Sequence, residues 1–258
     1  ALWFVLEVGD YFERNGRCYD YIVDGAKEKI YSILQYFEQF ENTEGLLEGL
    51  KSWVFVEWSK ANDFTDGINY PTNMLYCKAL EVAGKLYCDG ALIKKAENNR
   101  KMIIKQSFNG DFFEDNAVRN ERGELKRLGH TSETCQYYAL FLGFADGDNF
   151  SEYRNKIITY FGRDRDASIV FTKVYKSNAF IGNMLRLCYL LKSKEYKRLL
   201  REIEEYFYEQ AMLGSTLWEH DKPVNSLNHG FASYAACLIV ESLKNSESYK
   251  YSFEINKG

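Results

Sequence analysis

Apolar residues recur along most of the chain with the spacing of amphipathic helices. Ile30, Ile33, Leu34 and Phe37, for example, occupy positions i, i+3, i+4 and i+7, which share one helix face. The same pattern returns in segment after segment. It predicts helices near residues 2–14, 18–40, 70–89, 91–107, 132–145, 150–161, 178–191, 195–212 and 226–244.

Turn signals separate these helices, at Asn15-Gly16, Asn109-Gly110, Asp146-Gly147-Asp148 and Gly214-Ser215. Two short segments, 53–58 and 110–113, are instead predicted to be extended, the first because it is rich in β-branched and aromatic residues. With only 2 prolines in the chain, long uninterrupted helices are favoured.

The predicted helices differ in character. Residues 195–212 carry many charges and therefore have a solvated face, whereas residues 226–244 hold few charges before Glu241. Alternation of outer and inner helices is typical of an all-α toroid built from helical hairpins. No linker and no repeat of fixed period interrupts the pattern, so a single domain over residues 1–258 is predicted.

Composition narrows the function classes. Hydrophobic residues make up 46% of the chain and charged residues 27%, as in ordinary folded proteins. With 33 Lys+Arg against 37 Asp+Glu, the net charge of -4 argues against a nucleic-acid partner. No apolar run approaches the ~18 residues that span a bilayer, so no membrane partner is expected. The many aromatic residues suit a large core and, in smaller part, the walls of a sugar cleft.

The six cysteines form no CxxC pair, and most lie in apolar helical patterns. Buried free thiols in a reducing, cytoplasmic location are therefore expected. Without paired ligand spacing no zinc site is predicted, and no cofactor or other metal is expected.

The first residues, Ala1-Leu2-Trp3, include no Met and no helix-capping side chain. A chain that begins within a helix is expected to be a fragment of a longer polypeptide. A processed natural start is the alternative.

The segment from Gly214 to Gly230 is the richest in chemistry. Trp218 and Glu219 are expected on a loop, and Asn228 and His229 in the first turn of the helix that follows. A carboxylate beside a tryptophan could have a tuned pKa and activate a water molecule. Alternatively, Glu219 only caps or pairs locally.

This segment resembles a motif of bacterial α-L-rhamnosidases of glycoside hydrolase family 78. The family pattern is Gly-x-Thr-x-Trp-Glu, then a loop, then Asn-Ser-Leu-Asn-His. The matching residues are Gly214, Thr216, Trp218, Glu219, Asn225, Ser226, Leu227, Asn228 and His229. Weaker resemblances cover residues 6–16, 53–58, 73–80 and 134–143. The resemblance implies an (α/α)6 six-hairpin toroid and an enzyme that hydrolyses terminal α-L-rhamnosides with inversion.

The resemblance also implies roles. Glu219 falls on the general base, His229 on a sugar-contacting histidine, and Trp58 on an aromatic wall. Glu57 stands where the family has Asp, and the loop after Glu219 is shorter, which implies a more open cleft. Glu57, Trp218, Asn228 and Asp63 complete the predicted substrate-binding set. Asp63, like Asn62 and Asp66, follows Trp58 and could bind sugar hydroxyls. A turn at Gly67 with Asp66 as an ordinary turn former is the equal alternative.

Two departures from the family qualify this prediction. Its general-acid motif, Asp-Glu-Arg-x-x-Trp-x-Gly-Asp, is not present in the chain, and nine predicted helices are fewer than the twelve of a complete toroid. The chain is therefore expected to be an incomplete toroid, inactive or weak alone, with exposed apolar surface that favours self-association. Alternatives are a non-catalytic carbohydrate-binding or scaffold module, and a toroid glycosidase for another sugar.

Two further histidines are given structural roles. His130 is predicted to cap the helix that follows it, in preference to a sugar contact, and His220 to be an exposed loop residue.

Overall fold

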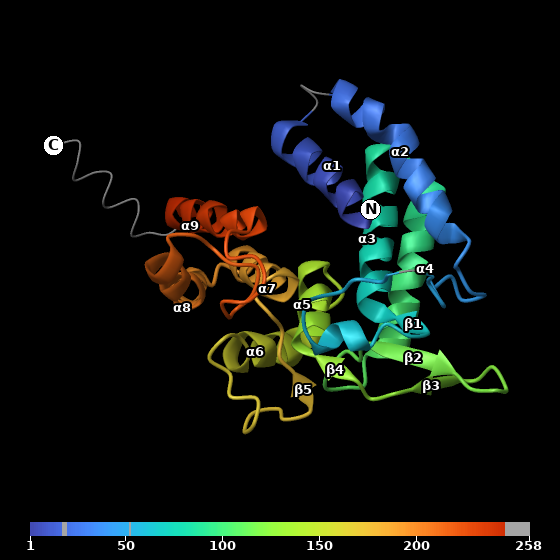
Figure 1. The fold of residues 1–258 in the computed structure, drawn as a ribbon. Helices are drawn as coiled ribbons and strands as arrows, with labels where there is room; N and C mark the ends of the chain where they lie inside the picture. Colours follow the sequence, from blue (N-terminus) through green and yellow to red (C-terminus); the bar gives the residue numbers. More distant parts are fainter. Residues whose placement is uncertain (17–19, 52, 246–258) are drawn as a thin grey trace. The chain divides into compact units, whose positions relative to one another are not determined.

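The computed structural model describes residues 1–16, 20–51 and 53–245, and helices dominate it (Figure 1). The chain divides into two compact units. The N-terminal unit comprises residues 1–56 and 63–131, and the C-terminal unit comprises residues 57–62 and 132–258. The single domain over residues 1–258 stays a prediction.

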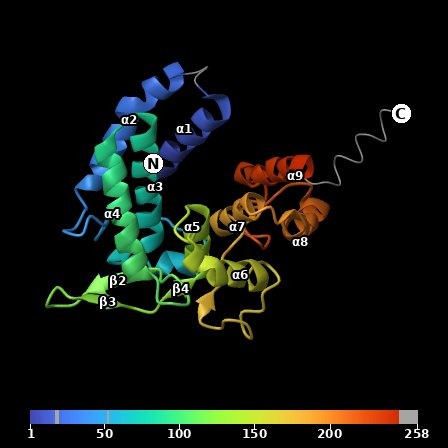
Figure 2. The same ribbon diagram turned by 180° about the vertical axis from the view of Figure 1, so that it is seen from behind.

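Four helices build most of the N-terminal unit: α1 (Leu2–Asn15), α2 (Asp20–Glu38), α3 (Tyr70–Leu86) and α4 (Gly90–Ser107). Helices α3 and α4 form a hairpin and lie side by side in both views (Figures 1 and 2). All four helices were predicted to within a few residues. The prediction succeeds because each helix buries one apolar stripe.

Local chemistry sets where these helices start. The Asn69 side chain accepts a hydrogen bond from the backbone N–H of Thr72 (3.0 Å), and Pro71 occupies the first turn of α3. The Asp89 carboxylate accepts from the N–H of Ala91 (3.0 Å) at the start of α4. Such caps satisfy N–H groups that have no partner within the helix.

A small antiparallel sheet of order β1-β2-β3 completes the N-terminal unit. Its strands are β1 (Ile68–Asn69), β2 (Asn116–Arg119) and β3 (Leu125–Arg127), and Ala117 pairs with Arg127. Sequence patterns did not predict it, because such short, polar strands leave no apolar alternation.

Of the two segments predicted to be extended, only one makes any β pairing. Residues 53–58 form no strand in the described part of the chain. Glu57 instead bonds backbone N–H groups at the start of α7. Within 110–113, Phe113 makes an isolated β-bridge to Phe108, so only one residue of that prediction pairs.

Five helices form the C-terminal unit: α5 (Glu133–Phe141), α6 (Ser151–Tyr160), α7 (Ile181–Lys192), α8 (Tyr196–Gly214) and α9 (Tyr234–Asn245). Short elements join the helices: the 3-10 helices η2 (Lys60–Asp63), η3 (Asp148–Phe150) and η4 (Gly230–Ser233), and the strands β4 (Thr131–Ser132) and β5 (Val174–Tyr175). Helices α7, α8 and α9, seen from behind in Figure 2, enclose a core. It includes Leu187, Leu190, Leu199, Ile203, Phe207 and Leu238.

A buried ion cluster ties helices α6, α7 and α8 together. Arg186 Nε lies 2.6 Å from Glu202 Oε2, and Arg198 Nε lies 2.6 Å from Glu202 Oε1. Arg186 also donates to the carbonyl oxygens of Ile157 (3.1 Å) and Phe161 (2.6 Å). The guanidinium thus satisfies carbonyls at the C-terminal end of α6 that the helix itself leaves unpaired.

The start of α9 corrects the prediction of a helix from residue 226. The helix begins at Tyr234, after η4. Asn228 and His229 therefore lie in the preceding loop and not in a helical turn. The reason is that backbone groups of this loop bond to the chain that leaves α8, as shown below.

The cysteine prediction is partly wrong. All five described cysteines are free thiols, and Cys77 and Cys135 are buried, but Cys88 and Cys237 are exposed. Cys18 lies outside the described residues.

Across residues 1–16, 20–51 and 53–245, no helix is both long and apolar enough to cross a membrane. The same residues hold no group of three or more His, Cys, Asp or Glu side chains placed to bind a metal ion. Helix α8 exposes Tyr208, Met212 and Leu213, while self-association stays a prediction.

Candidate functional site

Three segments of the C-terminal unit converge: the residues before η2, the residues before α7, and the loop from α8 to η4. The loop folds back on itself. The backbone N–H of Glu219 donates to the carbonyl of Ser226 (3.0 Å), and that of His229 donates to the carbonyl of Leu217 (2.9 Å). These two bonds bring Glu219 and His229 to the same end of the loop.

Glu219 lies at the centre of the site. Trp58 Nε1 donates to Glu219 Oε1 at 2.8 Å, and His229 Nε2 lies 3.9 Å from the same oxygen. The Glu219 side chain is 16% exposed, and Trp58 is 39% exposed. Among the described residues, Glu219 Oε2 takes no hydrogen bond, so this oxygen can accept a proton from a solvent molecule.

Aromatic rings pack around two of the residues that approach the Glu219 carboxylate. Phe180 and His229 pack edge to face with ring centroids 5.1 Å apart, and Phe180 also packs on Phe231 at 4.5 Å. Trp58 lies 6.3 Å from the ring of His220. A half-buried carboxylate with one unpaired oxygen can take a proton from a bound molecule, which is what a general base does.

Glu57 is fully buried directly before Trp58 in the chain. Its carboxylate accepts backbone hydrogen bonds from Gly182 (2.7 Å), Ile181 (3.1 Å) and Asn178 (3.2 Å), at the N-terminus of α7. Burial raises the pKa of Glu57 to about 7, and these N–H donors act against that rise. Glu57 was predicted to bind substrate, but it has no exposed surface with which to contact one. Its hydrogen bonds instead attach the neighbouring Trp58 to the start of α7.

Gly182 makes this anchor possible. A Cβ atom at this position would lie 2.5 Å from Glu57 Oε2 and 2.6 Å from the Cβ of Ser177. Only glycine lets the start of α7 approach the Glu57 carboxylate so closely.

Trp218 was also predicted to bind substrate, but it is 5% exposed and presents no ring face. Its backbone N–H donates to Gln210 Oε1 (2.8 Å), so it fixes the chain beneath Glu219. Its indole nitrogen is buried without a hydrogen-bond partner among the described residues.

The last two predicted residues make no printed contact with Glu219. Asn228 is exposed in the loop directly before His229, and Asp63 is exposed and belongs to the N-terminal unit. The structure therefore brings Trp58, Glu219 and His229 together, while the predicted roles of Asn228 and Asp63 stay predictions.

Sequence analysis did not predict the hydrogen-bonded chain of Asn178, His220 and Asn225 beside Glu219. His220 was predicted to be exposed, but it is half-buried, and both ring nitrogens have partners: Asn178 Nδ2 at 2.8 Å and Asn225 Nδ2 at 2.9 Å. No spacing rule connects residue 178 to residue 220. Asn225 has a left-handed backbone (φ 57°), a conformation that Asn adopts more readily than most residues. The residue type at position 225 was therefore a weak indication of a tight turn in the sequence.

The prediction for His130 is also wrong. Ser132 caps α5 by accepting from the N–H of Cys135 (3.1 Å). His130 instead stacks on Phe64 with centroids 4.1 Å apart and contacts Asn116 Oδ1 (2.9 Å).

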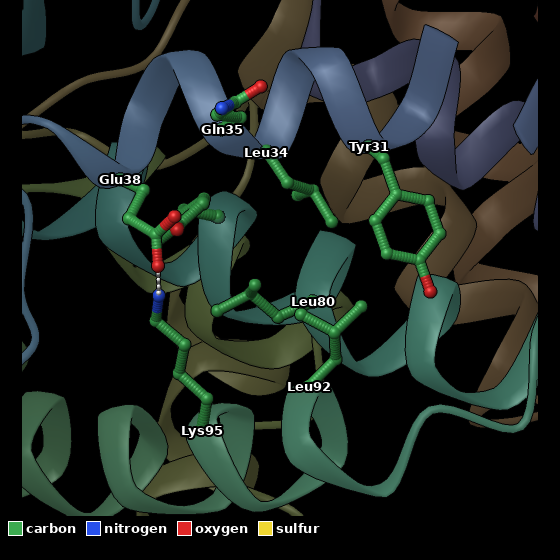
Figure 3. A pocket seen from close by; sticks show the side chains of 8 residues that line it. Tyr31, Leu34, Gln35, Glu38, Leu80, Leu92 and Lys95 are labelled. Carbon is green, nitrogen blue, oxygen red and sulfur yellow. Dashed lines mark hydrogen bonds and ion pairs between the residues drawn. The ribbon is translucent and has the colours of Figure 1, made fainter. Parts of the chain in front are cut away.

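The N-terminal unit has a groove of about 260 Å³ between α2, α3 and α4 (Figure 3). Leucines line much of it, and its two charged side chains pair with each other, Lys95 with Glu38 (3.0 Å), while Tyr31 donates to Asp89 (3.0 Å). A groove whose charges are neutralised within the protein is less suited to catalysis than the Glu219 site.

The fold belongs to the class of all-α toroids built from helical hairpins, as predicted. Two solved structures share it. One is a GH78 family rhamnosidase of Bacillus sp. GL1 (TM-score 0.74, 16% identity) and the other a rhamnosidase from Klebsiella oxytoca with rhamnose bound (TM-score 0.65, 13% identity).

Each likeness covers 92% of this chain, but only 25% and 45% of the two neighbours. A scan of the sequence against protein-family models and a search of the curated proteins found no match. The resemblance to family 78 rhamnosidases is thus confirmed at the level of the fold, while the roles of individual residues stay predictions.

Proposed function

We propose that this chain carries the general-base half of a glycoside hydrolase that acts on terminal α-L-rhamnosides with inversion. The observation that supports the proposal most is the convergence of Trp58 and His229 on Glu219, on a fold shared with rhamnosidases. These three residues are the ones that the motif resemblance assigned to the sugar wall, the sugar contact and the base.

In the proposed mechanism, Trp58 holds Glu219 Oε1, and Oε2 removes a proton from the attacking water. The water oxygen bonds to the anomeric carbon as the bond to the leaving oxygen breaks. Inversion needs a second carboxyl group, ~6.5–9.5 Å from the base, to protonate that leaving oxygen. No residue of the chain matches the family's general-acid motif.

The base half can be tested on the 258-residue chain without turnover. A cationic iminosugar analogue of rhamnose resembles the charged transition state, and a site shaped for that state binds such analogues better than the sugar itself. We expect the iminosugar to bind at least ~10-fold more tightly than rhamnose by calorimetry. In Glu219→Gln that preference should vanish while rhamnose binding persists. An unchanged preference in the variant would remove Glu219 from the proposal.

Turnover supplies a second measurement. The chain alone is expected to release no rhamnose from natural glycosides and at most traces from a nitrophenyl rhamnoside, whose leaving group needs little protonation. In an active parent enzyme, Glu219→Gln should lower hydrolysis by ~10²–10⁴-fold. Robust hydrolysis of a natural rhamnoside by the chain would place an acid within it, with Glu7 and Asp63 the first candidates.

A carbohydrate-binding module without catalysis is the second candidate, favoured by the unmatched acid motif. It predicts equal affinity for rhamnose and its iminosugar analogue.

A further inference from the structure

Asn178 lies in the segment just before α7, and hydrogen bonds engage both its backbone and its side chain. Its backbone N–H donates to Glu57 Oε2 (3.2 Å), and its carbonyl accepts from the N–H of Asn183 (3.1 Å). The residue is therefore fixed to the helix start and to the buried Glu57 before its side chain is considered.

The side chain of Asn178 bridges the two segments that carry Trp58 and Glu219. Its Nδ2 donates to the carbonyl of Trp58 (2.7 Å) and contacts His220 Nδ1 (2.8 Å). Its Oδ1 accepts from the backbone N–H of Asp221 (3.1 Å). His220 and Asp221 directly follow Glu219, so the amide holds the chain on both sides of the Trp58–Glu219 contact.

The orientation of this amide is determined by its partners. Oδ1 also accepts from the N–H of Ala179 (2.7 Å), so a flipped amide would point its N–H groups at two N–H donors. Nδ2 must then donate to His220, whose Nδ1 accepts. A neutral imidazole has a single accepting nitrogen, so Nε2 carries the proton, and the Asn225 amide 2.9 Å away must present its oxygen, not Nδ2, to accept it.

We infer that Asn178 is the positioning residue of this site, which keeps the Trp58 indole N–H aimed at Glu219. The indole and the carboxylate are both partly exposed, so water competes for their hydrogen bond and its net contribution is small. Such a bond does not by itself hold two chain segments together. The inference rests on the proposed function for what the pair does, but the pairing can be measured without any sugar.

The experiment follows the indole N–H of Trp58 in the chain. The protein has four tryptophans, so ¹⁵N-indole spectra are simple, and Trp58→Phe assigns the signal. In Asn178→Ala we expect the Trp58 N–H to exchange with water at least ~10-fold faster, because the segments separate and the bond to Glu219 opens. Asn155→Ala is the matched control, since Asn155 is exposed on α6 of the same unit and should change nothing.

A second variant separates positioning from folding. Asn178→Asp keeps an acceptor for Asp221 and Ala179 but loses both donor contacts, so it should also accelerate exchange at Trp58. If Asn178→Ala does not fold, as judged by circular dichroism, this variant decides. Unchanged Trp58 exchange in a folded variant overturns the inference, and so does an equal acceleration in Asn155→Ala.

Ligand binding then links positioning to function. In folded Asn178→Ala the iminosugar should bind at least ~10-fold more weakly, with the loss concentrated on the iminosugar and not on rhamnose. An equal loss for both ligands, or no loss, would reject positioning of Glu219. If the wild-type chain binds neither ligand, the proposed function fails while the exchange result still tests the role of Asn178.

Discussion

The two units of the molecule place their carboxylates in contrasting environments. In the N-terminal unit, Glu81 bonds Lys78 (3.0 Å), Lys85 (2.6 Å) and Arg100 (3.1 Å) on partly exposed helix faces. Although partial burial alone would raise it, the hydrogen bonds and charges of Lys85 and Lys78 lower the pKa of Glu81 to about 2. In the C-terminal unit, Glu202 is fully buried against Arg186.

Glu57 extends the contrast, because its carboxylate is held by backbone N–H groups at a helix start, and burial raises its pKa to about 7. Surface pairs adjust helix stability by small amounts, whereas buried charges fix where chain segments lie. Among the described residues, the ion pairs with both side chains almost fully buried, Arg165–Glu133 and Arg186–Glu202, lie in the unit that carries the candidate site.

Removing Glu202 should have the largest effect on stability. Glu202→Ala leaves Arg186 buried without its carboxylate, which we expect to lower the free energy of unfolding by about 3–5 kcal/mol. Urea denaturation measures the change. Glu81→Ala is the comparison in the N-terminal unit, and its effect should be about 1 kcal/mol or less. Equal losses in the two variants would abolish the contrast between the units.

The pH dependence of stability should differ in sign between Glu57 and Glu81. Since folding raises the pKa of Glu57 from 4.5 to about 7, its proton binds more tightly in the folded state, and stability falls as pH rises from 4.5 to 7. The expected contribution is about 3 kcal/mol. Glu81, with its lowered pKa, contributes stability above pH 4.5 that is lost as pH falls toward 2.

Urea midpoints of the wild type and Glu57→Gln at several pH values isolate the Glu57 contribution, because only the slope with pH matters. The slope between pH 4.5 and 7 should be less negative in the variant. A ¹³C titration of the Glu57 carboxyl provides a direct check, and a midpoint near 4.5 would contradict the raised pKa.

A methyl group at position 182 tests the close approach of α7 to Glu57. Gly182→Ala should lower stability by about 1–3 kcal/mol, because the new Cβ meets Glu57 Oε2 and Ser177. Gly25→Ala on α2 meets no atom within 4 Å and should stabilise by about 0.5–1 kcal/mol. Thermal melts of both variants should therefore shift in opposite directions, and a shared direction would reject the steric argument.

The smallest expected effect concerns the start of the Glu219 loop. Ser215 ends α8 in a left-handed conformation (φ 55°), which strains a residue with a Cβ. Ser215→Gly should raise stability by ~0.5–1 kcal/mol. Ser193→Gly, at a cap with φ -81°, should gain nothing, and a comparable gain there would exclude strain at Ser215 as the cause.

The helices could be predicted from the sequence because each repeats apolar residues at the helical period, as Ile30 and Leu34 do in α2. The start of α9 could not. Residues 226–233 include apolar positions compatible with a helix, but the Ser226 carbonyl and the His229 N–H bond to Glu219 and Leu217 in the preceding chain. The periodicity of apolar residues does not report such competition between backbone partners that are distant in the sequence.

The site was predictable where the motif names residues, and unpredictable where contacts span distant positions. Trp58, Glu219 and His229 were named by resemblance, and the structure brings them together. The link from Asn178 to Trp58 and His220 crosses 120 and 42 positions, so no local pattern reports it. The burial of Glu57 was missed because its N–H partners belong to α7.

The arginine that closes the end of α6 has a consequence for unfolding. Arg186, on α7, bonds the α6 carbonyls and the α8 carboxylate of Glu202 with one guanidinium group. Opening any one of these helices therefore exposes buried charge belonging to the other two. The three helices should behave as a single cooperative unit, so partial unfolding of this region is disfavoured and the scaffold beneath the Glu219 loop is lost or kept as a whole.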